Sequence, residues 1–192
     1  MLRATTIEHL QKTYGSQDTV VCFIYCYYKS QSEQTPANLV SSLLRPLTIE
    51  TKSKDITTTF MEFYKVFDGK GSCPSLGEYS SLLLALIAKL KRVFIIVDAL
   101  DECSRDARSV FLAELKKLPS SVSLMFTTRP IPDILDSFVD TPRIEVRASD
   151  DDVRTYLTKE IELSPSLARW VKADSGLAGE IVEKVIEKSK GM

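Results

Sequence analysis

A continuous apolar run in the middle of the chain, Arg92 to Ala99, constrains the fold most strongly. Its sequence is RVFIIVDA, in which Val93 to Val97 are all apolar and lead directly into Asp98. Runs without alternation are typical of a strand that is covered on both faces, as in a parallel sheet packed between helices. We therefore expect an α/β fold in which Asp98 stands at the carboxyl end of a buried strand.

Other segments also have strand character. Thr19 to Tyr28 (TVVCFIYCYY) is dense in β-branched and aromatic residues, which favour a buried strand. Ser123 to Thr128 (SLMFTT) is predicted as a third strand, which Pro130 and Pro132 cannot continue. Arg143 to Val146 is predicted as a short fourth strand.

Apolar residues recur at helical spacing between and after these strands. Thr35 followed by Pro36 is a helix start, and Ser149 with Asp152 is another. The nearly continuous apolarity of Tyr79 to Leu90 predicts a helix that packs between neighbours. In the helix from Ala107 the expected buried face is Val110, Phe111, Leu115 and Leu118. The predicted helices span Leu2 to Tyr14, Thr35 to Leu47, Ile56 to Phe67, Tyr79 to Leu90, Ala107 to Leu118, Asp152 to Ile161, Pro165 to Lys172 and Leu177 to Lys190. Strands that alternate with helices indicate a parallel sheet with right-handed crossovers.

Charge and hydropathy exclude some partners. The 25 basic and 26 acidic residues give a net charge of -1, so neither nucleic acid nor an anionic membrane is predicted as a partner. The apolar stretches are shorter than the roughly 20 residues that a bilayer span needs. Met1 to Thr13 has charged residues in place of an apolar signal-peptide core. We expect a cytoplasmic protein.

The four cysteines are scattered, which suits reduced thiols better than a disulfide framework. Cys22 and Cys26 are the nearest pair, but positions i and i+4 of a strand lie roughly 13 Å apart. The chain has a single histidine, His9. A zinc site is therefore not expected.

Three carboxylates follow the central strand. Asp98 ends it, and Asp101 and Glu102 come three and four residues later. The carboxyl ends of parallel strands are where α/β proteins bind ligands, so these acids suit a magnesium nucleotide. An equally good interpretation places Asp101 and Glu102 in the first turn of the next helix, where acids stabilise the helix dipole.

A second polar group follows the next strand. Phe126 to Pro130 (FTTRP) ends in two hydroxyls and Arg129, a group suited to a γ-phosphate. The two groups are about 30 residues apart, as one strand–helix–strand crossover requires. This spacing favours one shared site over two unrelated surface clusters.

The ordered set of motifs resembles NACHT domains, which are signal-transduction P-loop NTPases. FIIVDALDEC is similar to an extended Walker B motif, and FTTRP is similar to sensor 1. TTIEHLQ, VCFIYCYYKSQSEQTPANLVSSLLRPL, PSLGEYSSLLLALI, DDVRTYLTKEI and VEKVIEKSKGM resemble other elements of the domain, especially in the fungal subgroup that carries ankyrin repeats. The resemblance covers nearly the whole chain.

The resemblance implies roles for individual residues. Asp98 matches the acid that holds Mg²⁺ through water. Asp101 and Glu102 match the catalytic acids that complete the magnesium shell and orient the attacking water. Arg129 matches the nucleotide-binding sensor arginine. The implied cofactor is Mg²⁺ with ATP or GTP.

One departure concerns the phosphate loop. The family has GxxxxGKS or GxxxxGKT before its first helix, whereas Met1 alone precedes Leu2 here. The sequence Gly69 to Ser72 lacks the glycine spacing of such a loop and is interpreted as a surface turn. We expect a partial P-loop NTPase three-layer fold with a mostly parallel sheet that lacks the Walker A strand. Residues 1–148 would form this core, and residues 149–192 would begin the helical subdomain. Both ends are interpreted as cut.

Three hypotheses follow. In the first, the chain is a fragment of a nucleotide-switch signalling protein. The fragment by itself neither binds nor hydrolyses nucleotide. In the second, it is an active NTPase module whose phosphate loop lies upstream. In the third, it is a non-catalytic interaction module. The expected partners include repeat or effector domains of a full-length parent. Self-association through the NTPase domain is also expected, because an open strand edge at Ser123 to Thr128 favours pairing with another chain.

Overall fold

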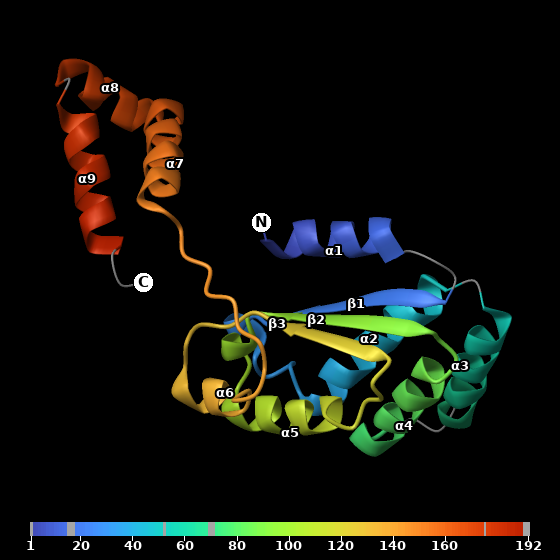
Figure 1. The fold of residues 1–192 in the computed structure, drawn as a ribbon. Helices are drawn as coiled ribbons and strands as arrows, with labels where there is room; N and C mark the ends of the chain where they lie inside the picture. Colours follow the sequence, from blue (N-terminus) through green and yellow to red (C-terminus); the bar gives the residue numbers. More distant parts are fainter. Residues whose placement is uncertain (1, 15–17, 52, 69–71, 175, 190–192) are drawn as a thin grey trace. The chain divides into compact units, whose positions relative to one another are not determined.

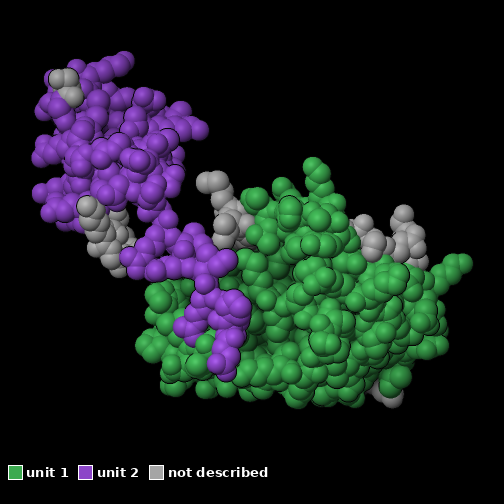
Figure 2. Space-filling view, viewed as in Figure 1, with its two compact units in different colours: residues 1–139 green, residues 140–192 purple. Residues whose placement is uncertain are grey.

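The computed structural model describes residues 2–14, 18–51, 53–68, 72–174 and 176–189. The chain divides into two compact units, residues 1–139 and residues 140–192 (Figure 2). This division falls somewhat before the expected boundary after residue 148. Most of the predicted turn at Gly69 to Ser72 lies outside the described residues.

A parallel sheet forms the centre of the first unit (Figure 1). Its described strands are β1 (Thr19–Tyr25), β2 (Arg92–Asp98) and β3 (Val122–Phe126), with β2 in the middle. The register pairs Tyr25 with Asp98 and Val97 with Phe126. All three strands therefore end at one edge of the sheet, and the predicted parallel α/β arrangement is confirmed.

Helices cover both faces of this sheet (Figure 1). One face carries α1 (Leu2–Tyr14), and the other carries α2 (Pro36–Ile49), α4 (Leu76–Ile87) and α5 (Arg105–Leu115), with α3 (Lys54–Phe67) packed on α2 and α4. Side chains alternate along β1, so Val20 joins the large core beneath α2 while Val21 joins a smaller cluster beneath α1. The predicted N-cap is confirmed, since the Asn38 amide donates to the Thr35 hydroxyl at 3.2 Å.

The direction of α1 matters for the site. Near its end the Tyr14 ring lies 5.4 Å from the Phe94 ring, close to the start of β2. Earlier in α1, Ile7 packs with Ile96, which is closer to the end of β2. Helix α1 therefore runs antiparallel to the strands, and its N-terminal end lies toward the edge where they finish (Figure 1).

The predicted fourth strand does not form. Arg143 to Val146 is part of the second unit and has no strand assignment. Ile144 is 90% exposed and Val146 is 64% exposed. A strand of four residues needs buried apolar area to offset its loss of conformational entropy, and this segment buries almost none.

Three smaller expectations also need correction. β1 ends at Tyr25, so the predicted strand is too long at its end. Helix α4 does not pack between neighbours on all sides, because Leu84 is 36% exposed while Leu83 and Ile87 are buried. In α5, Val110 is exposed, and the buried positions are Ala107, Arg108, Phe111, Leu112 and Leu115. The buried stripe is centred on Arg108, Phe111, Leu112 and Leu115, which face the core, so Val110 lies beside it on the solvent side.

The second unit consists of α7 (Asp150–Leu163), α8 (Pro165–Ala173) and α9 (Leu177–Ser189). Ser149 and Asp152 form a capping box, as predicted: the Asp152 amide donates to the Ser149 hydroxyl at 3.1 Å. The buried core of this unit is Ile161, Val182 and Ile186. None of the described helices combines the length and apolar character that a bilayer crossing requires.

Candidate functional site

The backbone turns sharply where β2 ends. Ala99 has φ 54° and ψ 48°, a left-handed conformation that costs a residue with a side chain about 1–2 kcal/mol. A short 3-10 turn, η2 (Leu100–Glu102), follows. Leu100 is fully buried, and its amide donates to the Thr127 carbonyl oxygen at 2.9 Å. Burial of Leu100 and pairing with β3 hold the strained turn in place.

Thr127 connects the ends of β2 and β3. Its hydroxyl donates to Asp98 Oδ1 at 2.7 Å and accepts from the Ala99 amide at 2.9 Å. The Thr127 amide also donates to the Val97 carbonyl oxygen at 2.9 Å. One hydroxyl therefore orients the Asp98 carboxylate and supports the left-handed residue beside it.

Asp101 pairs with the predicted sensor arginine. Arg129 Nε lies 2.5 Å from Asp101 Oδ2, and the Arg129 amide donates to Asp101 Oδ1 at 3.1 Å. The Asp101 side chain is only 4% exposed, whereas that of Arg129 is 74% exposed. Burial alone would raise the pKa of the Asp101 carboxyl, but the hydrogen bonds and charge of Arg129 outweigh it and hold that pKa below its usual value.

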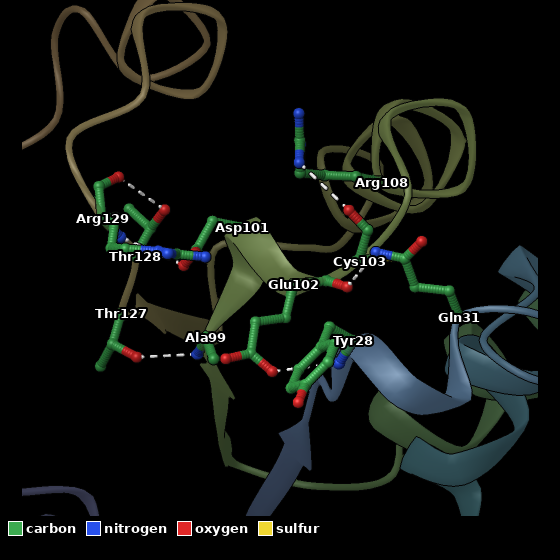
Figure 3. A network of polar contacts seen from close by, with 10 residues as sticks. All are labelled: Tyr28, Gln31, Ala99, Asp101, Glu102, Cys103, Arg108, Thr127, Thr128 and Arg129. Atoms are coloured by element: carbon green, nitrogen blue, oxygen red, sulfur yellow. Dashed lines mark hydrogen bonds and ion pairs between the residues drawn. The ribbon is translucent and has the colours of Figure 1, made fainter.

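Glu102 faces away from this pair, toward the segment after β1 (Figure 3). Its Oε2 accepts from the Tyr28 amide at 3.0 Å, and its carbonyl oxygen accepts from Gln31 Nε2 at 2.8 Å. Tyr28 begins a second 3-10 turn, η1 (Tyr28–Ser30). The Gln34 side chain closes this segment by donating to the Tyr27 carbonyl oxygen at 2.5 Å. Glu102 is therefore held at both its side chain and its backbone.

A buried arginine contacts the turn that follows β2. We call η2 and the residue after it, Leu100 to Cys103, the acidic turn, because it carries Asp101 and Glu102. Arg108, on α5, is 7% exposed. Its Nη1 donates to the Cys103 carbonyl oxygen at 3.2 Å, and its Nη2 lies 2.6 Å from Asp133 Oδ2 on α6 (Pro132–Asp136). Arg108 thus joins the end of the turn to the short helix that follows β3.

A solvent-open hollow of about 400 Å³ lies between the two strand ends. Its lining is Ala99, Asp101, Glu102, Thr127, Thr128 and Arg129. Three of the four predicted site residues therefore surround one space, and the fourth, Asp98, is joined to it through Thr127. Within the described residues, no three His, Cys, Asp or Glu side chains are grouped as metal ligands.

Sequence reasoning missed the residues that hold the acids in place. Tyr28 contributes through its backbone amide, and Gln31 contacts Glu102 from more than 70 positions away. Neither leaves a signal in the sequence. Arg108 does leave one, because it lies on the same helical stripe as Leu112 and Leu115 and therefore faces the core.

No curated protein matches the chain. One family model does match, described as nephrocystin 3, N-terminal, and it covers residues 1–129. These are 129 of the 192 residues and include the strand ends with Asp98 and Arg129. The chain therefore belongs to the nephrocystin 3 N-terminal family.

Proposed function

We propose that the edge where β2 and β3 end is the magnesium–nucleotide site of a NACHT-type switch domain with a P-loop NTPase fold. The observation that carries the proposal is the convergence of Asp101, Glu102 and Arg129 on one hollow, with Asp98 joined to it through Thr127. The sheet order also supports it, because the strand ending in the acids lies beside the strand ending in the arginine.

The donor set suits Mg²⁺. This ion prefers oxygen ligands, keeps several waters and is commonly held by one or two carboxylates together with substrate phosphates. Asp98 can supply such a carboxylate. The Thr127 hydroxyl donates to its Oδ1 and so orients the group. A bound Mg²⁺ would neutralise phosphate charge beside the carboxylates of Asp101 and Glu102. A cluster of three protein ligands is therefore not required.

Arg129 is placed to respond to an anionic ligand. Its contacts with Asp101 run through Nε and its backbone amide, and the side chain is 74% exposed. A guanidinium has five N–H donors, so it can turn toward a phosphate in exchange for Asp101. We propose that the Asp101–Arg129 pair is the resting state of the switch and that a γ-phosphate competes with Asp101 for the guanidinium.

Glu102 is also in a resting arrangement. Its carboxylate accepts from the Tyr28 amide, so it would have to leave η1 before it could orient a water molecule. The N-terminal end of α1 lies toward the same edge, and the start of a helix favours anions. These features support a site that is assembled when nucleotide binds.

We further propose that residues 1–192 by themselves bind magnesium nucleotide negligibly. Two carboxylates and one guanidinium are among the described residues that line the hollow. Such a lining attracts a polyphosphate poorly unless a lysine and a row of backbone amides are added. Hydrolysis by this segment alone is therefore not expected.

The test compares two charge removals, Asp98→Asn and Asp106→Asn, in a longer protein in which a GxxxxGKS or GxxxxGKT phosphate loop has been added before residues 1–192. Asp106 is an exposed acid in the first turn of α5 and serves as the matched control. Titration calorimetry should show magnesium-dependent ATP or GTP binding that Asp98→Asn weakens roughly tenfold or more, about 1.4 kcal/mol, and that Asp106→Asn leaves unchanged. Asp98→Asn should still fold but should not hydrolyse nucleotide.

Two results would contradict the proposal. Parental binding and hydrolysis in Asp98→Asn would remove the metal role of that acid. A micromolar dissociation constant for ATP or GTP with residues 1–192 alone would show that this segment already contains a complete phosphate site.

A further inference from the structure

Strand β3 has a neighbouring strand on one side only among the described residues, because β2 lies between β1 and β3 (Figure 1). None of the five β3 side chains is buried, whereas Val93 to Val97 of β2 all are. Leu124, in the middle of β3, is 39% exposed. The side of β3 that faces away from β2 is therefore an exposed edge of the sheet.

The backbone groups on this edge follow from the ladder between β3 and β2. The Ser121 carbonyl oxygen accepts from the Val93 amide at 3.2 Å, and the Thr127 amide donates to the Val97 carbonyl oxygen at 2.9 Å. Backbone groups of successive strand residues point alternately to the two sides of a strand. The residues of β3 that direct their N–H and C=O groups away from β2 are therefore Val122, Leu124 and Phe126. We call these backbone groups the β3 edge.

One group of the β3 edge already has a partner. The Val122 amide donates to the Pro119 carbonyl oxygen at 2.9 Å, so Val122 contributes only its carbonyl oxygen to the edge. Leu124 and Phe126 each present a donor and an acceptor. A row of exposed N–H and C=O groups is a template for a further strand.

The sequence of β3 has none of the features by which edge strands commonly prevent such pairing. Those features are charged side chains, prolines within the strand and bulges. From Leu118 to Thr128 the chain has no charged residue, and Pro119 comes before the strand. The register with β2 runs without a bulge from Val122 to Phe126. A second copy of this uncharged strand can therefore approach without charge repulsion.

We propose that the β3 edge is a self-association surface, on which β3 of a second copy pairs antiparallel about a two-fold axis at Leu124. In this register the two Leu124 residues face each other and exchange both of their N–H···O bonds. Each Phe126 amide donates to the Val122 carbonyl oxygen of the other copy. The surface does not include the residues that line the hollow, so the proposal goes beyond the function proposed above and does not rest on it.

The side chains suit the same register. Val122 lies opposite Phe126 of the other copy, and β-branched residues pair favourably with aromatic residues across antiparallel strands. Leu124 is aligned with Ile95 of β2, and its exposed part would be covered by Leu124 of the other copy. A two-fold interface uses the same surface on both copies, so the assembly closes as a dimer with one continuous sheet.

The size of this interface sets its strength. Stable protein interfaces bury about 1,200–2,000 Å², which is more than one pair of short strands supplies. We therefore expect a weak dimer whose population rises with protein concentration.

The experiment uses the 192-residue chain over a roughly hundredfold range of concentration. A reducing agent is present, because the exposed Cys73 could otherwise cross-link two copies. Sedimentation should show a monomer–dimer equilibrium. In hydrogen exchange with mass spectrometry, peptides from β3 should gain protection as the concentration rises, and peptides from β1 should not. This measurement needs no variant, so it holds even if a substitution in β3 prevents folding.

Leu124→Lys tests the two-fold axis. It places two ammonium groups opposite each other in the dimer, so it should raise the dissociation constant roughly tenfold or more. The matched control is Leu84→Lys, because Leu84 is 36% exposed and Leu124 is 39% exposed. Leu84 lies on α4, which packs against α2, the helix that contacts β1 at the other edge of the sheet. The control should leave dimerisation unchanged.

Opposite charges at the same position distinguish pairing at the axis from a general effect of charge. Leu124→Glu by itself should also be monomeric. An equal mixture of Leu124→Lys and Leu124→Glu should form a dimer, because opposite charges then face each other across the axis.

Four results would overturn the proposal. The parent could stay monomeric at every concentration, or its dimer could survive Leu124→Lys. The mixture of the two charged variants could stay monomeric while the parent dimerises. Protection of β3 that does not change with concentration would show that another segment of the same chain covers the β3 edge.

Discussion

The two units of the chain have helices of similar length but very different interiors. In residues 1–139 the side chains of Leu43, Ile95 and Phe111 are completely or almost completely buried between sheet and helices. Among the described residues of 140–192, three form the buried core, while Trp170 is 64% exposed. A segment of about 50 residues buries too little apolar area to be more than marginally stable. The amphipathic helices of the second unit are therefore expected to be only marginally stable by themselves. The candidate site lies in the first unit, which contains the sheet.

The largest expected effect comes from the core of the first unit. Phe111→Ala should lower the free energy of unfolding of residues 1–139 by about 3–5 kcal/mol, because Phe111 is fully buried under the sheet. Hydrogen exchange with mass spectrometry, which reports peptides of each unit separately, should show loss of protection in β2 and α5 and little change in α7 to α9.

Two variants sharpen this comparison. Val110→Ala changes an exposed neighbour on the same helix and should alter stability by less than about 0.5 kcal/mol. Ile186→Ala removes a buried core side chain of the second unit and should abolish protection there while leaving the sheet protected. Equal loss of protection in both units with Phe111→Ala would contradict their independence.

A smaller effect is expected at the acidic turn. Asp101→Asn removes a charged acceptor that two groups of Arg129 contact, and it should destabilise the first unit by about 1–2 kcal/mol in urea unfolding. The control is Glu145→Gln in the segment of the second unit that precedes α7, where Glu145 and Arg147 are both about 70% exposed. That pair should contribute less than about 1 kcal/mol. Equal effects of the two substitutions would show that burial of Asp101 adds nothing.

The smallest effect is a dependence on pH. The pKa of Asp101 is held below its usual value, so the folded state binds its proton less readily than the unfolded state. This stabilisation is complete above the unfolded pKa, near 3.9, and is lost as the pH falls through the lower folded pKa. Urea unfolding at a series of pH values should show a steeper loss below about pH 4 in the parent than in Asp101→Asn. Parallel curves for the two proteins would rule out this contribution.

Sequence patterns predicted the elements of the first unit better than their ends. The β-branched run to Val97 indicated the central strand, and Thr35 with Pro36 indicated the start of α2, because these signals act over a few residues. The predicted strand at Arg143 to Val146 was wrong because a short alternating run needs a partner and a buried face. Those depend on residues that are distant in the sequence.

In the candidate site, too, some features follow from local sequence and others from contacts between residues that are distant in the sequence. The sequence by itself determined that Asp98, Asp101 and Glu102 follow one strand and Arg129 the next, because chain order and strand direction place both groups at one edge. Only the tertiary structure decided the partner of each group. The Asp98 carboxylate accepts a hydrogen bond from the Thr127 hydroxyl, that of Asp101 from Arg129, and that of Glu102 from the Tyr28 amide. Hydrogen bonds act over about 3 Å, so their partners are set by how the sheet, η1 and η2 pack, which no local pattern in the sequence records.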